Sequence, residues 1–210
     1  EREKRLRGLI LLGGRSDYTP QELAPLNIPY VCCSYDNQYG TLPPDSYASV
    51  SIADEEEACR AVTELYRCGH RRIAALVSGT EDRSISQLRY QGYVRALAAH
   101  GLPLERELVI EAGSFDIRQS YLAMQRRLLA GARFTALFAI SDNMAIGAMR
   151  ALREAGRRIP EDCSVIAIDG LTVSDYINPT LTTLCQPMEH MGRRSVEILL
   201  DMVEHRGGPI

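Results

Sequence analysis

Short apolar runs that each end in polar side chains constrain the fold of this chain more than any other feature. The runs, with the polar residues that follow them, are 73–77 with Ser78, 134–140 with Ser141 and Asp142, and 164–168 with Asp169. Runs of this length and composition are typical of strands buried in a parallel sheet. The carboxyl ends of parallel strands meet at one edge, where open α/β sheets bind ligands. The pattern therefore predicts an α/β fold with a binding site at that edge.

Strand and helix patterns alternate along almost the whole chain, which predicts mostly parallel sheets with right-handed crossovers. The expected strands are 8–12, 29–33, 49–52, 73–77, 107–112, 134–140, 164–168 and 182–185. The expected helices are 54–68, 87–100, 117–130, 143–155 and 187–205. We expect Asp54 to cap the first helix, with Glu57 reaching back, and Asp116 to cap the third. The strands between 73 and 168 suffice for one sheet, and the earlier strands belong to a second, incomplete one.

Composition excludes several classes of protein. The chain has 210 residues, 45% hydrophobic and 24% charged, which is ordinary for a globular protein and unlike a disordered one. No apolar run approaches the roughly 20 residues that a membrane helix needs. The net charge of −3 argues against binding of a nucleic-acid backbone by this chain itself. The six cysteines show no CxxC spacing, which favours reduced, buried thiols in a cytoplasmic protein.

The motifs that would indicate an enzyme are missing from the sequence. It contains no phosphate-binding P-loop, no Gly-x-Gly-x-x-Gly after a strand, no Gly-x-Ser-x-Gly elbow and no His-Glu-x-x-His pair. The four histidines are scattered singly. Asp142 and Asp169 are expected to approach each other at the sheet edge, which alone is poor evidence for hydrolysis. We therefore predict no enzyme activity, no cofactor and no metal.

The polar residues at the sheet edge indicate a binding site for a small molecule. Arg83 and Arg89 flank the start of helix 87–100, and a guanidinium donates to carboxylates, phosphates or neighbouring hydroxyls. The Asp169 carboxylate accepts hydrogen bonds from sugar hydroxyls or ring N–H groups. Phe115, in an expected loop, offers a face on which a ring can stack.

Each of these residues also has an alternative interpretation. Asp142 is equally suited to cap helix 143–155, and Phe115 to lie in the core. In the alternative interpretation, Arg83 is a solvated loop residue and Arg89 forms an ion pair within the fold. The convergence of these residues at the expected strand ends favours the binding interpretation.

Four segments, taken in order, resemble the effector-binding domain of the lactose-repressor/purine-repressor (LacI/GalR) family of bacterial transcription factors. They are Gly69–Ala74, Leu88–Tyr93, Ser141–Leu152 and Ile159–Asp169, and the match continues through Pro179–Pro187. The resemblance implies a periplasmic-binding-protein-like fold, in which a hinge joins two parallel-sheet subdomains around an effector cleft. Residues 1–52 plus 186–210 would form a partial N-terminal subdomain, and residues 53–185 the C-terminal one.

By position, the resemblance implies effector contacts by Asp169, Arg89, Arg83, Phe115, Ser141 and Asp142. Ser141 stands where many members have Asn, and Ile85 where some have a hydroxyl residue. These two departures bear on which ligand is bound.

The resemblance implies a cytoplasmic, non-catalytic sensor of a sugar or nucleobase-like effector that works as a homodimer without a membrane partner. Operator DNA would be bound only through a helix-turn-helix headpiece, which this chain does not contain. The alternative is a transport-type periplasmic solute-binding protein, which has the same architecture. It predicts a signal peptide, few free cysteines and a monomer, and the six cysteines and the lack of a secretory signal argue against it. A sugar-modifying enzyme would need a nucleophile or metal site.

Overall fold

The computed structural model describes residues 6–204, which divide into two compact units. The first unit contains the chain up to Ile52, the short segment Arg83–Ile85 and the chain from Pro187 onward. The second contains Ala53–Asp82 and Ser86–Gln186. The division expected from the sequence placed Arg83–Ile85 in the C-terminal subdomain. The segment instead belongs to the first unit, because the side chain of Ile85 packs against the core of that unit.

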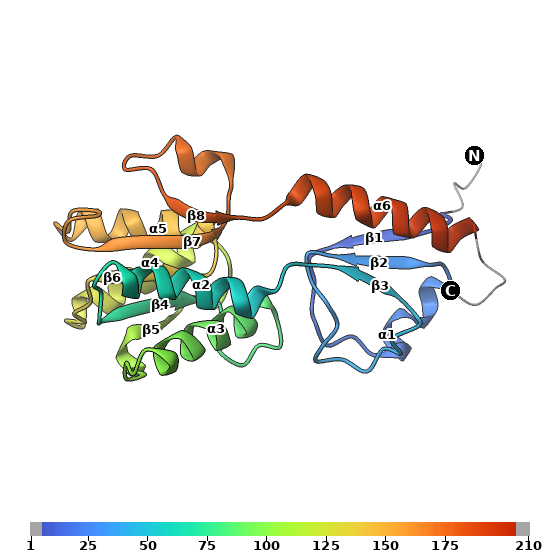
Figure 1. The fold of residues 1–210 in the computed structure, drawn as a ribbon, viewed down its shortest axis with the longest axis horizontal. Helices are drawn as coiled ribbons and strands as arrows, with labels where there is room; N and C mark the ends of the chain where they lie inside the picture. Colours follow the sequence, from blue (N-terminus) through green and yellow to red (C-terminus); the bar gives the residue numbers. More distant parts are fainter. Residues whose placement is uncertain (1–5, 205–210) are drawn as a thin grey trace. The chain divides into compact units, whose positions relative to one another are not determined.

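Within residues 6–204, the first unit is built on a three-stranded parallel sheet in the order β1-β2-β3 (Figure 1). Its elements are β1 (Leu9–Leu12), α1 (Pro20–Leu23), η1 (Ala24–Leu26), β2 (Tyr30–Cys33), β3 (Ala48–Val50) and α6 (Met188–Glu204). The central strand β2 is buried along its whole length, and α6 packs against all three strands. Tyr30, Cys32 and Tyr35 form the centre of this core.

The short helix α1 is absent from the elements expected from the sequence. Its start nevertheless carries a local signal, since Thr19 and Glu22 form a reciprocal capping box and Pro20 occupies the first turn. The helix is too short to show an apolar periodicity, so the turn residues around it obscured the signal.

In the described residues, the second unit contains a five-stranded, all-parallel sheet in the order β5-β4-β6-β7-β8 (Figure 1). Its strands are β4 (Ile73–Val77), β5 (Val109–Glu111), β6 (Ala136–Ala139), β7 (Ser164–Asp169) and β8 (Thr182–Cys185). Its helices are α2 (Asp54–Arg67), α3 (Ile85–Ala99), α4 (Ile117–Leu129) and α5 (Asp142–Glu154), with the short turns η2 (Arg106–Leu108) and η3 (Thr172–Asp175). The predicted parallel α/β architecture is confirmed.

The strand order of the second unit reverses between β4 and β6. The connection through α3 leads from β4 to β5, and the connections through α4 and α5 lead back past β4 to β6 and β7. Right-handed crossovers therefore place α3 on one face of the sheet and α4 with α5 on the other. The carboxyl ends of β4 and β6 flank the point of reversal, where open α/β sheets form their ligand crevice.

Two glycines let the helices on each face approach closely. A Cβ atom at Gly92 in α3 would lie 2.2 Å from the carbonyl oxygen of Glu55 in α2. A Cβ at Gly147 in α5 would lie 2.2 Å from the carbonyl oxygen of Ile117 in α4. Because the obstructing atoms belong to the backbone, no side-chain rotation would relieve either contact.

One predicted helix cap is confirmed and one is wrong. Asp116 caps α4, accepting from the Gln119 amide at 2.9 Å. Asp54 does not cap α2, since Ala53 occupies the cap position without a side-chain hydrogen bond. The Asp54 carboxylate instead pairs with Arg89, a residue of another helix.

The cysteines are less uniformly buried than the sequence suggested. Cys32, Cys33 and Cys163 are buried, but Cys68 and Cys185 are exposed. All six thiols are free. Among the described helices, none combines the length and apolarity needed to cross a membrane.

We expect Gly92→Ala to lower the free energy of unfolding by about 1–3 kcal/mol, because the added methyl group forces α2 and α3 apart. The matched control is Gly192→Ala in α6, where a Cβ atom would meet nothing within 4 Å. That variant should be about 0.5–1 kcal/mol more stable than the parent, since alanine is the better helix former. Urea unfolding measures the free energy of unfolding of both variants. A Gly92→Ala variant as stable as the parent would contradict the close packing of α2 and α3.

Candidate functional site

Arg89 lies at the centre of a buried network at the carboxyl edge of the sheet in the second unit. Its side chain is 3% exposed. Its Nε donates to Asp54 Oδ1 at 2.7 Å, and its Nη1 donates to the carbonyl of Ile140 and to Asp169 Oδ1 at 3.3 Å. Nη2 has no hydrogen bond to any residue from 6 to 204. The guanidinium therefore joins the start of α2, the end of β6 and the end of β7, so the expectation of an ion pair within the fold is confirmed.

Asp169 is the member of this network that most reaches the surface. Its side chain is 20% exposed, against 4% for that of Asp54. Oδ1 accepts from Gln186 Nε2 at 2.8 Å, and Oδ2 accepts from the Asp142 amide at 3.4 Å. The carboxylate is thus fixed in direction but still accessible, as a ligand-binding group must be.

The backbone of Asp169 is strained. Its φ angle is +148°, which side-chain-bearing residues rarely adopt, and Gly170 follows with a φ of +77°. The Asp169 carbonyl accepts from the Gln186 amide at 3.0 Å, which helps to hold this conformation. Gln186 has no motif that marks it in the sequence; the available hint is its place between a strand and Pro187.

The two polar residues that follow β6 have internal partners. Ser141 is the N-cap of α5 and accepts from the Met144 amide at 3.3 Å, so the interpretation of Asp142 as the cap is wrong. Asp142 is fully buried at the first position of the helix. The donors to its carboxylate are the Leu171 amide, Ser174 Oγ and Thr183 Oγ1. Asp142 therefore holds the loop after β7 and, through its amide, contacts Asp169.

A tight loop follows β4 and leads into α3. Ser86 Oγ accepts from the amides of Ser78 and Gly79 at 3.0 and 3.1 Å and donates to the Gly79 carbonyl at 2.7 Å. Ser78 Oγ donates to Asp82 at 2.9 Å. These bonds fix the first turn of α3, and Arg89 lies one turn further along the same helix.

Arg83 and Phe115 lie outside the Arg89 network. Arg83 is exposed, belongs to the first unit and has a φ of +52°; its carbonyl accepts from the Ser16 amide. Phe115 lies in the loop between β5 and α4 and is 38% exposed, so its interpretation as a core residue is wrong. The structure brings Arg89, Asp169, Asp142 and Ser141 together within the second unit.

The network carries more negative than positive formal charge. Asp54 and Asp169 pair with the guanidinium of Arg89, and Asp142 contacts Asp169 through its amide. Burial raises the pKa of Asp54 and of Asp169, and the guanidinium opposes the rise in both cases. No group of His, Cys, Asp and Glu side chains in residues 6–204 has the arrangement to hold a metal ion. The partly exposed Asp169 carboxylate can accept hydrogen bonds from donor groups.

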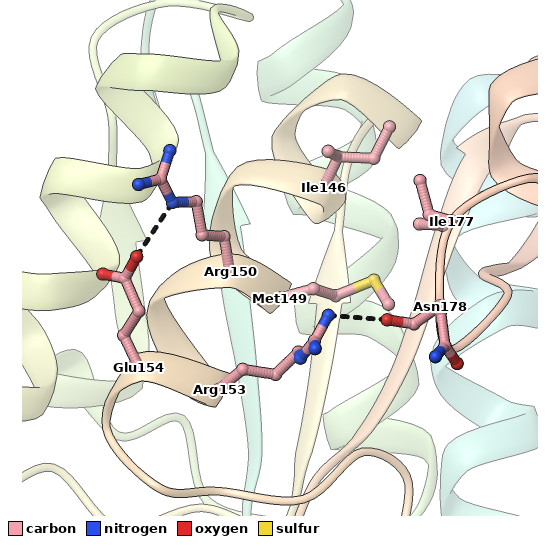
Figure 2. A pocket seen from close by; sticks show the side chains of 7 residues that line it. All are labelled: Ile146, Met149, Arg150, Arg153, Glu154, Ile177 and Asn178. Atoms are coloured by element: carbon pink, nitrogen blue, oxygen red, sulfur yellow. Dashed lines mark hydrogen bonds and ion pairs between the residues drawn. The ribbon is translucent and has the colours of Figure 1, made fainter.

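A concave surface lies along α5. It is a pocket of about 600 Å³ lined by Ile146, Met149, Arg150, Arg153, Glu154, Ile177 and Asn178 (Figure 2). Its rim is charged, with Arg150 paired to Glu154 at 2.9 Å and Arg153 donating to the Asn178 carbonyl at 2.7 Å. Beside Ile177, the Tyr176 side chain is 82% exposed. Apolar groups with charged neighbours are typical of surfaces that bind proteins.

Comparison with known proteins identifies the fold family. Residues 62–210 match the periplasmic binding protein-like domain family. The chain belongs to this family. It is 35% identical to the HTH-type transcriptional regulator CelR of Thermobifida fusca over 93% of this chain and 56% of that protein. It is 31% identical to the ribose operon repressor of Haemophilus influenzae over 96% of this chain and 59% of that protein.

Solved structures show the same relationship. A complex of the transcriptional regulator CelR with cellobiose matches with a TM-score of 0.86 and 33% identity, over 98% of this chain and 62% of that one. A LacI-family regulatory protein from Chloroflexus aggregans matches with a TM-score of 0.81 and 31% identity, over 97% and 71%. The resemblance to LacI-family regulators is therefore confirmed. The chain spans less than two thirds of the length of these curated relatives.

We expect Asp169→Asn to raise the free energy of unfolding at neutral pH. Because the native pKa of Asp169 is raised, the folded state holds its proton more tightly than the unfolded chain does. Stability contributed by the group therefore falls as the pH rises from the unfolded pKa of about 3.9 through the native pKa.

The advantage of Asp169→Asn over the parent should accordingly be smallest below about pH 4 and grow toward neutral pH. Urea unfolding at a series of pH values measures it. Asp175→Asn, at an exposed aspartate, controls for the loss of a surface charge. A difference between parent and Asp169→Asn that stays constant with pH would contradict the assigned environment.

Proposed function

We propose that this chain is the effector-sensing part of a DNA-binding transcriptional regulator, and that Asp169 holds a small polar effector, such as a sugar. The observation that carries the proposal is the partly exposed carboxylate of Asp169, fixed by Arg89 and Gln186 next to the point where the strand order reverses. The names of the relatives and the cellobiose complex of CelR support it.

The chemistry of the edge suits a polyhydroxylated ligand. A carboxylate with fixed oxygens accepts hydrogen bonds from neighbouring hydroxyl groups. Arg89 Nη2 supplies a donor beside it, and the exposed face of Phe115 suits a sugar ring or a nucleobase. Arg83 and Ser141 complete the proposed set of contacts, and Asp142 contributes through the amide that orients Asp169.

Regulation follows from a difference in effector affinity between two conformations. We propose that the two compact units are the N-terminal and C-terminal effector-binding subdomains, and that a headpiece outside this chain contacts operator DNA. The bound effector then shifts the population of conformations that bind DNA, without any chemical step. The cytoplasm is the compartment in which such a regulator works.

A transport-type solute-binding protein is the less favoured function. The relatives named above are transcriptional regulators. The six free thiols, two of them exposed, also fit a reducing compartment better than an oxidising one.

We further propose that the chain forms a homodimer through the pocket along α5. Apolar side chains of Ile146, Met149 and Ile177 line it, and Arg150, Arg153 and Glu154 place both signs of charge on its rim (Figure 2). A surface that carries both signs can pair with itself about a twofold axis, as isologous interfaces require.

The effector proposal predicts that Asp169→Ala shows a clearly smaller thermal stabilisation than the parent at the same effector concentration. The panel consists of sugars, sugar phosphates and nucleobases. A ligand at about 100 times its Kd stabilises the fold by about 2.7 kcal/mol. Loss of a charged hydrogen-bond acceptor costs about 1.5–3 kcal/mol of binding, which is roughly a 10-fold to 100-fold weaker Kd.

Asp175→Asn is the control and should respond like the parent. An Asp169→Ala variant that responds like the parent would remove Asp169 from the site. Measurable turnover of any sugar in the panel would contradict the non-catalytic role.

The dimer proposal predicts that Ile146→Arg shifts the chain to a monomer, because a buried, unpaired charge is costly at an interface. Sedimentation-velocity centrifugation measures the change, and circular dichroism checks that the fold is retained. Leu129→Arg, at an exposed apolar residue of α4 outside the pocket lining, is the control. A dimeric Ile146→Arg variant would place the interface elsewhere.

A further inference from the structure

Asp54 has a role beyond helix formation. It is the first residue of α2, where the helix dipole favours a negative charge, yet its carboxylate makes no capping bond. It accepts from Arg89 Nε at 2.7 Å instead, and both side chains are buried. Asp54 and Arg89 are 35 residues apart in the sequence, so the pair belongs to the tertiary structure.

The pairing with Asp54 changes what Arg89 can offer to a ligand. An arginine that receives an anion presents two parallel donors as a fork. Here Nε is taken by Asp54, and Nη1 by the Ile140 carbonyl and Asp169. Nη2 alone remains without a hydrogen bond to residues 6–204, so Arg89 does not offer two neighbouring nitrogens for bidentate binding of an anion.

The charges of the network also disfavour an anionic ligand. The charged groups that act most on Asp169 are Arg89 and Asp142, and those that act most on Asp54 are Arg89, Asp169 and Glu57. One guanidinium therefore faces several carboxylates, and Asp54 cancels the positive charge that would otherwise balance Asp169. A phosphate or carboxylate brought beside Asp169 would meet repulsion at low effective dielectric.

We propose that Asp54 is a specificity-determining residue: by holding Arg89 inside the fold, it makes the site around Asp169 select neutral polyhydroxylated ligands over phosphorylated or carboxylated ones. This inference rests on the proposed function of the same site. It concerns the chemical class of the effector, which neither the fold nor the relatives specify for this chain.

The test compares matched pairs of ligands by isothermal titration calorimetry. The pairs are cellobiose with cellobionate, glucose with glucose 6-phosphate, and ribose with ribose 5-phosphate. For the parent, we expect the neutral member of the pair that binds to have at least a tenfold lower Kd than its anionic counterpart. This arm does not depend on the folding of any variant.

Asp54→Asn tests the residue itself. The amide oxygen still accepts from Arg89 Nε, so the Kd of the neutral member should change by less than about fivefold, while the preference over the anion falls by at least tenfold. A purely structural role for Asp54 would weaken both members equally. Glu56→Gln removes an exposed negative charge from the same turn of α2 and should leave the preference as it is.

Three results would overturn the inference. If the anionic member of a pair binds the parent as tightly as the neutral member, the proposed selectivity for neutral ligands is wrong. The proposed sensing function is not affected by that result. An unchanged preference in Asp54→Asn removes Asp54 from specificity. Absence of binding by every member of every pair, and by the nucleobases of the thermal panel, would overturn the proposed function together with this inference.

Discussion

The buried guanidinium of Arg89 is the interaction on which the edge of the second unit depends. It binds the Asp54 carboxylate, the Ile140 carbonyl and the Asp169 carboxylate, and so fixes the first turn of α2 against the ends of β6 and β7. A buried charge is tolerable only when it is paired and hydrogen-bonded, as the Arg89 guanidinium is with Asp54. The three elements are therefore held in one arrangement.

The same network lies where the chain enters and leaves the second unit. Asp54 directly follows Ala53, the first residue of that unit, and Gln186, which binds both the carboxylate and the backbone of Asp169, is the last. The Ser86 hydroxyl fixes the point where the chain re-enters the unit after Arg83–Ile85, one turn of α3 before Arg89. A ligand that donates hydrogen bonds to Asp169 would therefore act on groups tied to each of these chain crossings. Strained backbone and a raised carboxyl pKa at Asp169 are features that functional sites keep at a cost in stability.

Sequence patterns located much of this site. The apolar runs that end at Asp169 and Ser141 correspond to β7 and to the end of β6, and helix α3 carries Arg89 to the same edge. Two members were missed for a physical reason. Asp54 follows the local pattern of a helix cap, and Gln186 follows no pattern, because both have partners that are distant in the sequence.

Taken by itself, the sequence determined the alternation of strands and helices, the strands whose ends form the edge and the cap of α4 by Asp116, since these depend on residues within a few positions of one another. The tertiary structure decided which carboxylates remain available. The Asp142 carboxylate accepts hydrogen bonds from the loop after β7, and the Asp54 carboxylate pairs with Arg89. The Asp169 carboxylate remains partly exposed. That division follows from burial and pairing between elements as much as 80 residues apart, which no local pattern encodes.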